Sequence, residues 1–484
     1  MTKYGPVATI KVASDLQKRL ICPEFAHENH SLQIPTLPEQ GDPKGILASA
    51  IYHDGKKIGN RFAVLPMEGW DATTDGKPSD LTKRRWQRFG TSGAKLLWGT
   101  EAVAVRHDGR ANPNQLLLSD ANLSPIADLK SAMVDAHRTA FGSAFDLVVG
   151  LQLTHSGRFA RPNRKDLFEP LCVMENPLLD RRYNIQSAEH LATDDDLSRL
   201  IEDFVEASVR AQKAGFDFVD VKHCHGYLGH ELLSARHRKG KFGGSLNNRM
   251  RFLREIVAGI RARAPGLGIG VRLSIFDSIP YRPGEDRIGV PDGQPEQYDM
   301  AFGLLNPQHG IDLAETIAFL QGCKEMGVRW ICTTAGSPYS TPHLQRPAQF
   351  PPSDGYFPPE DPCIGVTRQI LATATLKQLF PEFLFVGSGY SFLQDWLPQV
   401  AQVVVDAGMV DMVGLGRMIL AYPDLPADFL ASKQLDRKRV CRTFSDCTTA
   451  PRKGMISGCF PLDPFYRLMP EAEIVRSYRA KVGE

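Results

Sequence analysis

The chain has 484 residues, of which 42% are hydrophobic and 23% are charged, an ordinary globular composition with ample length for a large core. With 57 basic against 55 acidic residues, the formal charge of +2 argues against binding to nucleic acid or to an anionic membrane surface and favours a small-molecule partner. The N-terminus has no continuous apolar run, and no stretch reaches the roughly 20 apolar residues of a membrane helix, so we expect a cytoplasmic protein.

Short β-branched or apolar runs alternate with longer helix-like stretches from about residue 60, the pattern of repeated βα units. Candidate helices between the strands include Ile126–Phe141, Asp195–Ala214, Leu246–Ala264, Asp312–Met326 and Val366–Leu379. The eight candidate strands are Arg61–Leu65, Leu96–Val103, Asp146–Leu153, Phe216–Val221, Gly268–Leu273, Val328–Thr333, Phe383–Val386 and Asp411–Gly414. Eight strands, without a Gly-x-Gly-x-x-Gly after the first, predict an α/β fold of the (β/α)8 TIM barrel type rather than a doubly wound sheet.

Three regions are expected along the chain. Residues 1–59 resemble a cap with a hairpin that turns at His53-Asp54-Gly55-Lys56, residues 60–430 form the barrel, and residues 431–484 form a C-terminal extension. Two long insertions, 280–310 and 336–362, each follow a strand directly. In a barrel both would lie on the C-terminal face, where we expect them to shape the substrate site.

The most informative stretch runs from Asp217 to Leu228 and reads Asp-Phe-Val-Asp-Val-Lys-His-Cys-His-Gly-Tyr-Leu. It leads from a buried strand straight into titratable residues, which would point into the mouth of the barrel. Lys222, His225 and Tyr227 can all donate hydrogen bonds, so together they could polarise a carbonyl or bind an anion and supply a proton.

This stretch resembles the signature of the Old Yellow Enzyme family, in which a His-x-x-His or His-x-x-Asn pair followed by Gly-Tyr-Leu binds a substrate carbonyl and the Tyr protonates the substrate. The resemblance covers residues 60–425, with further matches in the same order as in the family. They are Asn60-Arg61 with Pro66-Met67, Gln152-Leu-Thr-His-Ser-Gly-Arg158, Gly243-Gly-Ser-Leu-Asn-Asn-Arg-Met-Arg-Phe252, Val271-Arg272-Leu273-Ser274, Gly387-Ser388-Gly389 and Gly414-Leu-Gly-Arg417. The barrel domains of dienoyl-CoA reductase and trimethylamine dehydrogenase are similar.

The resemblance implies FMN as cofactor and NADH or NADPH as electron donor, in an enzyme that reduces an activated C=C bond. It assigns cofactor contacts to Pro66, Met67, Glu68, Ala102, Gln152, Arg272, Gly387, Ser388, Gly389, Gly416 and Arg417. Arg272 would lie at the pyrimidine edge of the flavin, where a positive charge stabilises the anionic reduced form. The glycines and Arg417 would hold the phosphate, because glycine allows close approach of backbone amides.

Three positions of the barrel depart from the family pattern, among them Thr154, which stands where the yeast-type members carry a Trp that narrows the pocket. Lys222 stands where the first His of the carbonyl pair is usual, which favours an acidic or strongly polarised substrate or a nearby carboxylate partner. Glu68 replaces the usual Thr or Cys beside the flavin. Since an ionised carboxylate there would disfavour reduced flavin, we expect Glu68 to be protonated, displaced or paired with a cation such as Lys222.

Nine cysteines, an odd number scattered from Cys22 to Cys459, do not form a disulfide framework. Cys441, Cys447 and Cys459 have nearly the spacing of the iron–sulfur ligands in the multidomain relatives, but Phe444 takes the place of the second ligand. Three thiolates are too few for a four-cysteine cluster, so we expect no iron–sulfur cluster and assign no metal ligand, while a three-cysteine cluster or a zinc site at these residues stays open.

Two other functions stay open at this point. An FMN enzyme of this kind could instead oxidise an amine, with Glu68 and Trp70 holding the cation. A lyase without flavin could form a Schiff base on Lys222, but this would leave Arg272, Gly387–Gly389 and Arg417 without a role. The natural substrate, the choice of NADH or NADPH and the oligomeric state, homo-oligomers included, are not decided by the sequence.

Overall fold

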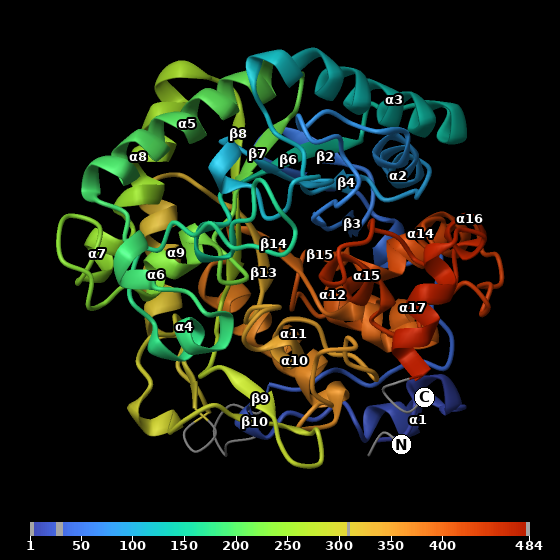
Figure 1. Cartoon of the computed structure of the whole chain (residues 1–484). Helices are drawn as coiled ribbons and strands as arrows, with labels where there is room; N and C mark the ends of the chain where they lie inside the picture. Colours follow the sequence, from blue (N-terminus) through green and yellow to red (C-terminus); the bar gives the residue numbers. More distant parts are fainter. Residues whose placement is uncertain (1–3, 26–31, 307–309, 481–484) are drawn as a thin grey trace.

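The computed structural model describes residues 4–25, 32–306 and 310–480, and within them parallel strands close into a barrel surrounded by helices (Figure 1). The strands pair in the order β4-β3-β15-β14-β13-β8-β7-β6-β5, and β4 also pairs with β6. Their bounds are β3 Phe62–Val64, β4 Leu96–Leu97, β5 Ala102–Ala104, β6 Val148–Thr154, β7 Phe218–Val221, β8 Gly268–Ser274, β13 Trp330–Thr334, β14 Leu384–Gly387 and β15 Met412–Leu415. The predicted (β/α)8 barrel is confirmed.

The second barrel strand is interrupted, whereas a continuous Leu96–Val103 was expected. It consists of β4 and β5, because Thr100 between them has a φ of 44°, which a strand does not accommodate. Gly99 lies so close to the next strand that a Cβ there would be 2.9 Å from the Cβ of Gln152. The break lets the N–H of Ala102 bond the carbonyl of Met67 at 3.0 Å, which ties the ends of two strands together.

The outer helices include those that were predicted, with shifted bounds. They are α2 Asp80–Gly90, α3 Leu123–Phe141, α5 Asp194–Lys213, α8 Arg251–Arg263, α9 Ala314–Glu325, α11 Pro362–Leu379 and α12 Leu397–Asp406. Among them, α2 and α12 come in addition to the predicted helices. Thr193 starts α5: its hydroxyl accepts the N–H of Asp196, and the Asp196 carboxylate accepts the N–H of Thr193. The helix expected over Leu246–Ala264 is instead two, because the chain kinks at Met250 between α7 (Leu246–Arg249) and α8.

The N-terminal hairpin covers the end of the barrel where the parallel strands begin. Strands β1 (Ile51–His53) and β2 (Lys56–Ile58) are antiparallel around Asp54 and Gly55, which have φ values of 45° and 75°. The carboxylate of Asp54 accepts a 2.7 Å hydrogen bond from Trp330 of β13. Ile58 packs into the barrel interior, so the hairpin seals the end opposite the one that carries the chemistry.

The two insertions pack against each other. The first contains the hairpin of β9 (Tyr281–Pro283) and β10 (Gly289–Pro291) and the pair β11 (Leu305–Asn306) and β12 (Gly310–Ile311), while 307–309 lie outside the described residues. The N–H of Gly289 bonds the carbonyl of Phe357 at 2.9 Å, which joins the hairpin to the second insertion. The second insertion contains α10 (Pro342–Gln345).

Shorter helices complete the described chain, and those of the C-terminal region have a small apolar core of their own. The shorter helices are α1 Ala13–Gln17, α4 Pro177–Tyr183, α6 Leu228–Ser234, α13 Arg417–Ala421, α14 Leu425–Leu430, α15 Asp446–Arg452, α16 Pro464–Arg467 and α17 Glu471–Ala480. Ala450, Phe460 and Val475 belong to the C-terminal core, which Figure 1 shows in red beside the barrel. The division of the chain at residues 59 and 430 stays a prediction. Every helix in the described ranges is too short or too polar to cross a bilayer.

Candidate active site at the C-terminal face of the barrel

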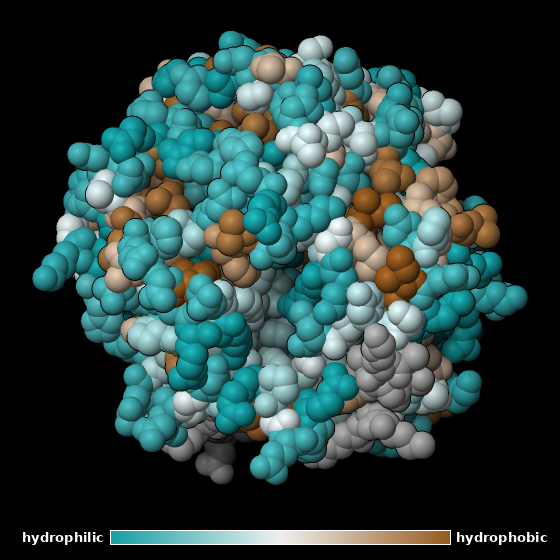
Figure 2. Space-filling model, in the orientation of Figure 1, coloured by the Kyte–Doolittle hydropathy of each residue, from teal (hydrophilic) through white to brown (hydrophobic). Residues whose placement is uncertain are grey.

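One cavity gathers almost all of the predicted site residues. The empty space in and in front of it amounts to about 1470 Å³, open solvent at the mouth included, and the face shown in Figure 2 is hollowed near its centre. Its lining includes Pro66, Met67, Glu68, Ala102, Gln152, Lys222, His225, Tyr227, Arg272, Ser388, Gly389, Gly416 and Arg417. Gly387 is the exception: it lies at the end of β14, where an added Cβ would be 3.0 Å from the Tyr390 ring.

The cavity has two walls of different origin. The strand-end wall consists of residues at or just after the carboxyl ends of barrel strands, and the loop wall consists of residues from the long loops and the C-terminal extension. The strand-end wall comprises Pro66, Met67, Glu68, Ala102, Gln152, Lys222, His225, Tyr227, Arg272, Ser388, Gly389, Gly416 and Arg417. The loop wall comprises Arg161, Pro338, Tyr339, Gln345, Arg346, Thr448, Pro451, Arg452 and Ser457.

A buried carboxylate that the sequence reasoning missed orients the strand-end wall. Asp220 of β7 is fully buried and accepts hydrogen bonds from Gln152 Nε2 at 2.6 Å and from Trp98 Nε1 at 2.8 Å. Its other oxygen accepts the backbone N–H of Arg272 at 2.6 Å. Burial raises the pKa of Asp220. An acidic residue inside the apolar run Phe218–Val221 was the available signal, since a buried carboxylate needs dedicated partners.

Arg272 lies between the strand ends with part of its guanidinium free to bind a ligand. One terminal nitrogen donates to the Pro66 carbonyl at 3.1 Å, and Nε is buried without a partner among the described residues. The side chain is 5% exposed. A buried, unpaired N–H of this kind fits a hydrogen-bond acceptor on a bound flavin ring.

The ends of β14 and β15 provide a second set of unused donors. Ser388 Oγ and Arg417 Nη1 are buried with no partner in the described part of the chain, while Arg417 Nη2 donates to the Pro347 carbonyl at 2.6 Å. Gly389 has a φ of 94°, and a Cβ at Gly416 would meet open space. A cationic side chain, a hydroxyl and open backbone together fit a phosphate group.

The segment after β7 turns sharply and brings Tyr227 back over the cavity. His225 and Gly226 have φ values of 66° and 77°, and the N–H of His225 donates to Ser274 Oγ at 3.0 Å. The hydroxyl of Tyr227 donates to Glu68 and lies 3.2 Å from the Tyr339 hydroxyl. Burial, and then the charge of Glu68, raise the pKa of Tyr227 well above 10, so the phenol stays protonated at neutral pH.

Lys222 lies against the ring of Tyr227, with Nζ 3.9 Å from its centroid. Burial lowers the pKa of Lys222 despite the opposing charge of Glu68. Glu68 itself is bonded to Tyr227 and forms no ion pair with a described residue. Glu68 is therefore not hydrogen-bonded to Lys222, the cation suggested as its partner. Its partner is the hydroxyl of Tyr227, and the Lys222 ammonium lies over the Tyr227 ring instead.

His225 is held by neighbours that keep its ring in place. Its Nε2 is 3.2 Å from Thr334 Oγ1 and 3.4 Å from Gln345 Nε2. Burial, followed by the charges of Arg272 and Lys222, lowers the pKa of His225 well below 6.5. The imidazole is thus neutral at pH 7, with one N–H and one acceptor nitrogen.

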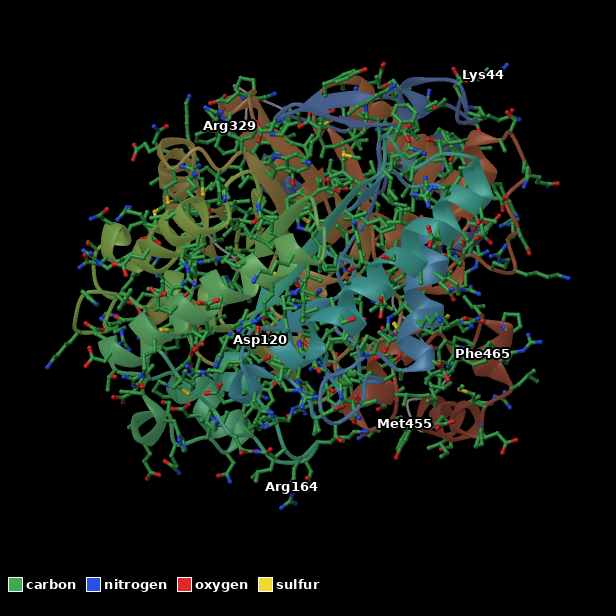
Figure 3. The ribbon with its side chains drawn as sticks, turned by 90° about the horizontal axis from the view of Figure 1, so that it is seen from above. Lys44, Asp120, Arg164, Arg329, Met455 and Phe465 are labelled. Carbon is green, nitrogen blue, oxygen red and sulfur yellow. The ribbon has the colours of Figure 1, made fainter. Side chains whose placement is uncertain are left out.

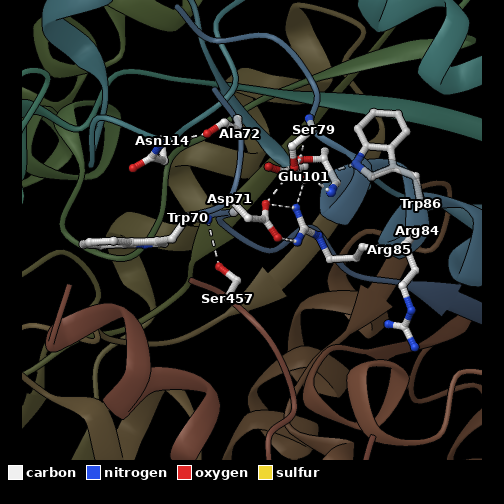
Figure 4. A network of polar contacts seen from close by, with 12 residues as sticks. Trp70, Asp71, Ala72, Ser79, Arg84, Arg85, Trp86, Glu101, Asn114 and Ser457 are labelled. Atoms are coloured by element: carbon white, nitrogen blue, oxygen red, sulfur yellow. Dashed lines mark hydrogen bonds and ion pairs between the residues drawn. The ribbon is translucent and has the colours of Figure 1, made fainter. Parts of the chain in front are cut away.

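A buried ion network supports the loop that carries Glu68 (Figure 4). Arg85 of α2 donates to Asp71, and its Nη2 lies 2.7 Å from Glu101, which also accepts from Trp86 Nε1 at 3.0 Å. All four groups are buried. The N–H of Trp70 donates to Ser457 Oγ at 2.8 Å, so the same loop is bonded to the C-terminal extension.

The C-terminal cysteines surround a small hollow next to Arg417. Cys441 and Cys459 are buried and Cys447 is half-buried, with Phe444 between them in the lining. The Phe444 ring stacks on Phe350 at 5.8 Å, and the Arg479 guanidinium lies 4.5 Å from its centroid. Within the described residues, no group of three or more His, Cys, Asp or Glu side chains could hold a metal ion.

Comparisons with known proteins identify the family of this chain. Residues 51–290 match the NADH:flavin oxidoreductase / NADH oxidase family. An NADPH dehydrogenase of Bacillus subtilis is 30% identical over 285 residues, which cover 57% of this chain and 70% of the relative. The chain belongs to the NADH:flavin oxidoreductase / NADH oxidase family. It is an oxidoreductase of the Old Yellow Enzyme type, with FMN as cofactor and NADH or NADPH as electron donor, as the motifs predicted.

Solved structures support the fold. A 2-naphthoyl-CoA reductase superposes with a TM-score of 0.61 at 18% identity, covering 87% of this chain and 57% of that one. The Old Yellow Enzyme homologue of Zymomonas mobilis gives a TM-score of 0.54 at 21% identity, covering 82% and 96%. The chain therefore spans little more than half the length of the first neighbour. The family match ends at residue 290, so it does not include the second insertion or the C-terminal extension of the loop wall.

Proposed function

We propose that this enzyme reduces an activated C=C bond at the expense of NADH or NADPH. FMN, when bound in the cavity, would supply hydride transfer between the nicotinamide and the substrate. The observation that carries the proposal is the placement of Tyr227: a buried phenol in the FMN cavity, with a pKa held well above 10, beside hydrogen-bond donors. Such a group can protonate the α-carbon of an alkene that receives hydride at its β-carbon.

Lys222 and His225 would hold the carbonyl or nitro group that activates the alkene. Both line the same cavity as Tyr227. The neutral His225 offers an N–H, and Lys222 offers an ammonium that favours the negative charge developing on the activating group during hydride addition. On this proposal Gln152 and Arg272 contact the flavin ring, while Arg417 and Ser388 contact its phosphate.

The arrangement of Trp70 argues against amine oxidation. A cationic amine would need the faces of aromatic rings, but the Arg161 guanidinium lies 5.0 Å from the Trp70 ring centroid. The Glu68 carboxylate is bonded to Tyr227. Lys222 is buried, and its pKa is lowered, as Schiff-base chemistry requires, but membership of the flavin family favours the oxidoreductase role.

Anaerobic half-reactions test the proposal. The FMN-loaded enzyme is first reduced with NADPH or NADH. It is then mixed with an enone, a nitroalkene or an amine, and reoxidation is followed as the recovery of the oxidised-flavin absorbance in the 450 nm region. We expect reoxidation by at least one class of activated alkene, with a stoichiometric saturated product. Flavin reduction by amines, together with no reoxidation by any activated alkene, would contradict the proposal.

A further inference from the structure

The charges that line the cavity are strongly unbalanced. The lining residues in the described part of the chain include seven basic side chains and a single carboxylate, Glu68. The basic residues are Arg85, Arg161, Lys222, Arg272, Arg346, Arg417 and Arg452. A buried or half-buried cation without an acidic partner is costly, so such a surplus needs an anionic occupant.

Some of these cations are already neutralised within the protein. Arg85 is paired with Asp71 and Glu101, and Arg452 lies 2.8 Å from Asp354. Bound FMN accounts for others, since its phosphate suits Arg417 and its ring suits Arg272. Arg346 belongs to the phosphate side, because Arg417 Nη2 donates at 2.6 Å to the carbonyl of Pro347, the next residue in the chain.

Arg161 is left over, and it lies near the proton donor. Its Nε donates to the Ala111 carbonyl, and Ala111 packs in one apolar cluster with Tyr227 and Tyr339, whose hydroxyls are 3.2 Å apart. Tyr339 stacks on Phe159, two residues before Arg161, with ring centroids 3.8 Å apart. Arg161 is therefore placed where a substrate would lie with its alkene beside Tyr227.

Hydrogen bonds and ring contacts hold the Arg161 side chain in a fixed position. Nε donates to the Ala111 carbonyl at 3.2 Å and Nη1 donates to the Lys165 carbonyl at 3.3 Å. The guanidinium lies 5.0 Å from the ring centroids of both Trp70 and Phe168. It forms no ion pair with a described residue, and Nη2 makes no hydrogen bond to one, so the planar edge stays available to a carboxylate.

We propose that Arg161 binds an anionic group of the substrate, a carboxylate, and makes this enzyme selective for alkenes that carry one. This inference rests on the proposed ene-reductase function. The carboxylate is a second recognition point, separate from the activating group held by Lys222 and His225. The same guanidinium chemistry would also suit a phosphate of the nicotinamide nucleotide, and the experiment distinguishes the two sources.

The variant Arg161→Gln removes the charge and retains a polar side chain. The matched control is Arg164→Gln on the same loop, because Arg164 is exposed, pairs with Asp166 and extends from the surface in Figure 3. FMN content and thermal unfolding of both variants should equal those of the wild type. Arg161→Lys keeps the positive charge but loses the planar guanidinium, and it should retain part of the preference for substrates that carry a carboxylate.

Binding is measured first, by calorimetry on the FMN-loaded enzyme with benzoate and its neutral analogue benzamide. We expect benzoate to bind about tenfold or more tightly than benzamide in the wild type and in Arg164→Gln, and the preference to vanish in Arg161→Gln. This readout does not require turnover, so it tests Arg161 even if no alkene is reduced. Equal benzoate affinity in the wild type and Arg161→Gln would overturn the inference.

Catalysis is measured next, with dithionite-reduced enzyme so that no nucleotide takes part. Reoxidation by β-benzoylacrylate should slow by about 10- to 100-fold in Arg161→Gln, while its methyl ester reacts at an unchanged rate. Flavin reduction by NADPH relative to NADH should be the same in the wild type and the variant. A changed NADPH to NADH ratio with unchanged selectivity for the acid would assign Arg161 to the nucleotide phosphate and overturn the carboxylate assignment.

Discussion

The two walls of the cavity differ in origin and in chemistry. The strand-end wall is built on barrel strands, and its side chains are oriented by short buried bonds such as those of Asp220. The loop wall comes from long loops, among them the second insertion, and from the C-terminal extension, and three of its members are arginines. We infer that the two walls have different roles: the barrel supplies the flavin chemistry, and the loops select the substrate by charge.

The largest expected effect is that of Tyr227→Phe on the strand-end wall. Because the proton donor is lost, reoxidation of reduced enzyme by alkenes should slow by about 100-fold or more, for acids and esters alike. Flavin reduction by NADPH should stay within about threefold of wild type, since general acid chemistry is not needed there. Rapid mixing measures both steps. Tyr52→Phe, exposed on the N-terminal hairpin, is the control.

An equal loss of rate in both half-reactions would contradict the role of Tyr227. A loss of reoxidation rate confined to acidic substrates would contradict the assignment of proton donation to the strand-end wall and of charge selection to the loop wall. Either result would show that the hydroxyl acts in binding rather than in protonation.

The next effect concerns the cofactor. Arg417→Gln removes the only strand-end cation next to Ser388, Gly389 and Gly416 in the described cavity lining, so the Kd for FMN should rise by about 10- to 100-fold. Fluorescence titration of the apoenzyme with FMN and with riboflavin measures this. Riboflavin affinity should not change, because it has no phosphate. Arg199→Gln, exposed on α5, is the control, and a parallel loss for riboflavin would remove Arg417 from the phosphate site.

A smaller effect is expected in the pH dependence. Burial lowers the pKa of Lys222 below 10.5, so a reaction that needs its ammonium is supported at low pH and declines as the pH rises through that lowered pKa. The kcat/KM for an enone should therefore show a descending limb below pH 10.5 that is absent in Lys222→Met. Lys18→Met, an exposed control, should keep the limb. The same limb in Lys222→Met would exclude Lys222 as its origin.

The smallest effect is that of Glu68→Gln on the flavin. A carboxylate near the ring disfavours the electron-rich reduced form, so its removal should raise the two-electron reduction potential by about 30 mV. Redox titration against a reference dye measures the shift. Glu175→Gln, exposed and outside the cavity lining, should leave the potential unchanged. An unchanged or lowered potential in Glu68→Gln would contradict this effect of the Glu68 side chain.

Much of the strand-end wall was predictable because its residues follow buried strands. The strand pattern put Lys222 at the mouth of the barrel, and the family motifs assigned Arg272 and Arg417 to FMN. The interruption at Thr100 was not predictable, since a positive φ in a polar residue depends on the contact of Gly99 with Gln152 across the sheet. The hydrogen bond from Tyr227 to Glu68 joins residues 159 positions apart, which no local pattern encodes.

The loop wall could not be predicted from periodicity. Arg346 is positioned by Thr448 of the C-terminal extension, and Tyr339 by stacking on Phe159. Both contacts are tertiary. Arg161 stands just after the Gln152–Arg158 motif, but only the packed structure shows that its guanidinium turns to Trp70 and stays without a carboxylate.

The most direct test of the central claim is isotopic. The wild-type enzyme reduces an enone with NADPH that carries deuterium at both C4 positions, in ordinary water, and then with unlabelled NADPH in deuterium oxide. The account predicts deuterium at the β-carbon in the first product and at the α-carbon in the second, with α-deuteration lost along with turnover in Tyr227→Phe. Solvent deuterium at the β-carbon, or no saturated product from any activated alkene, would contradict it.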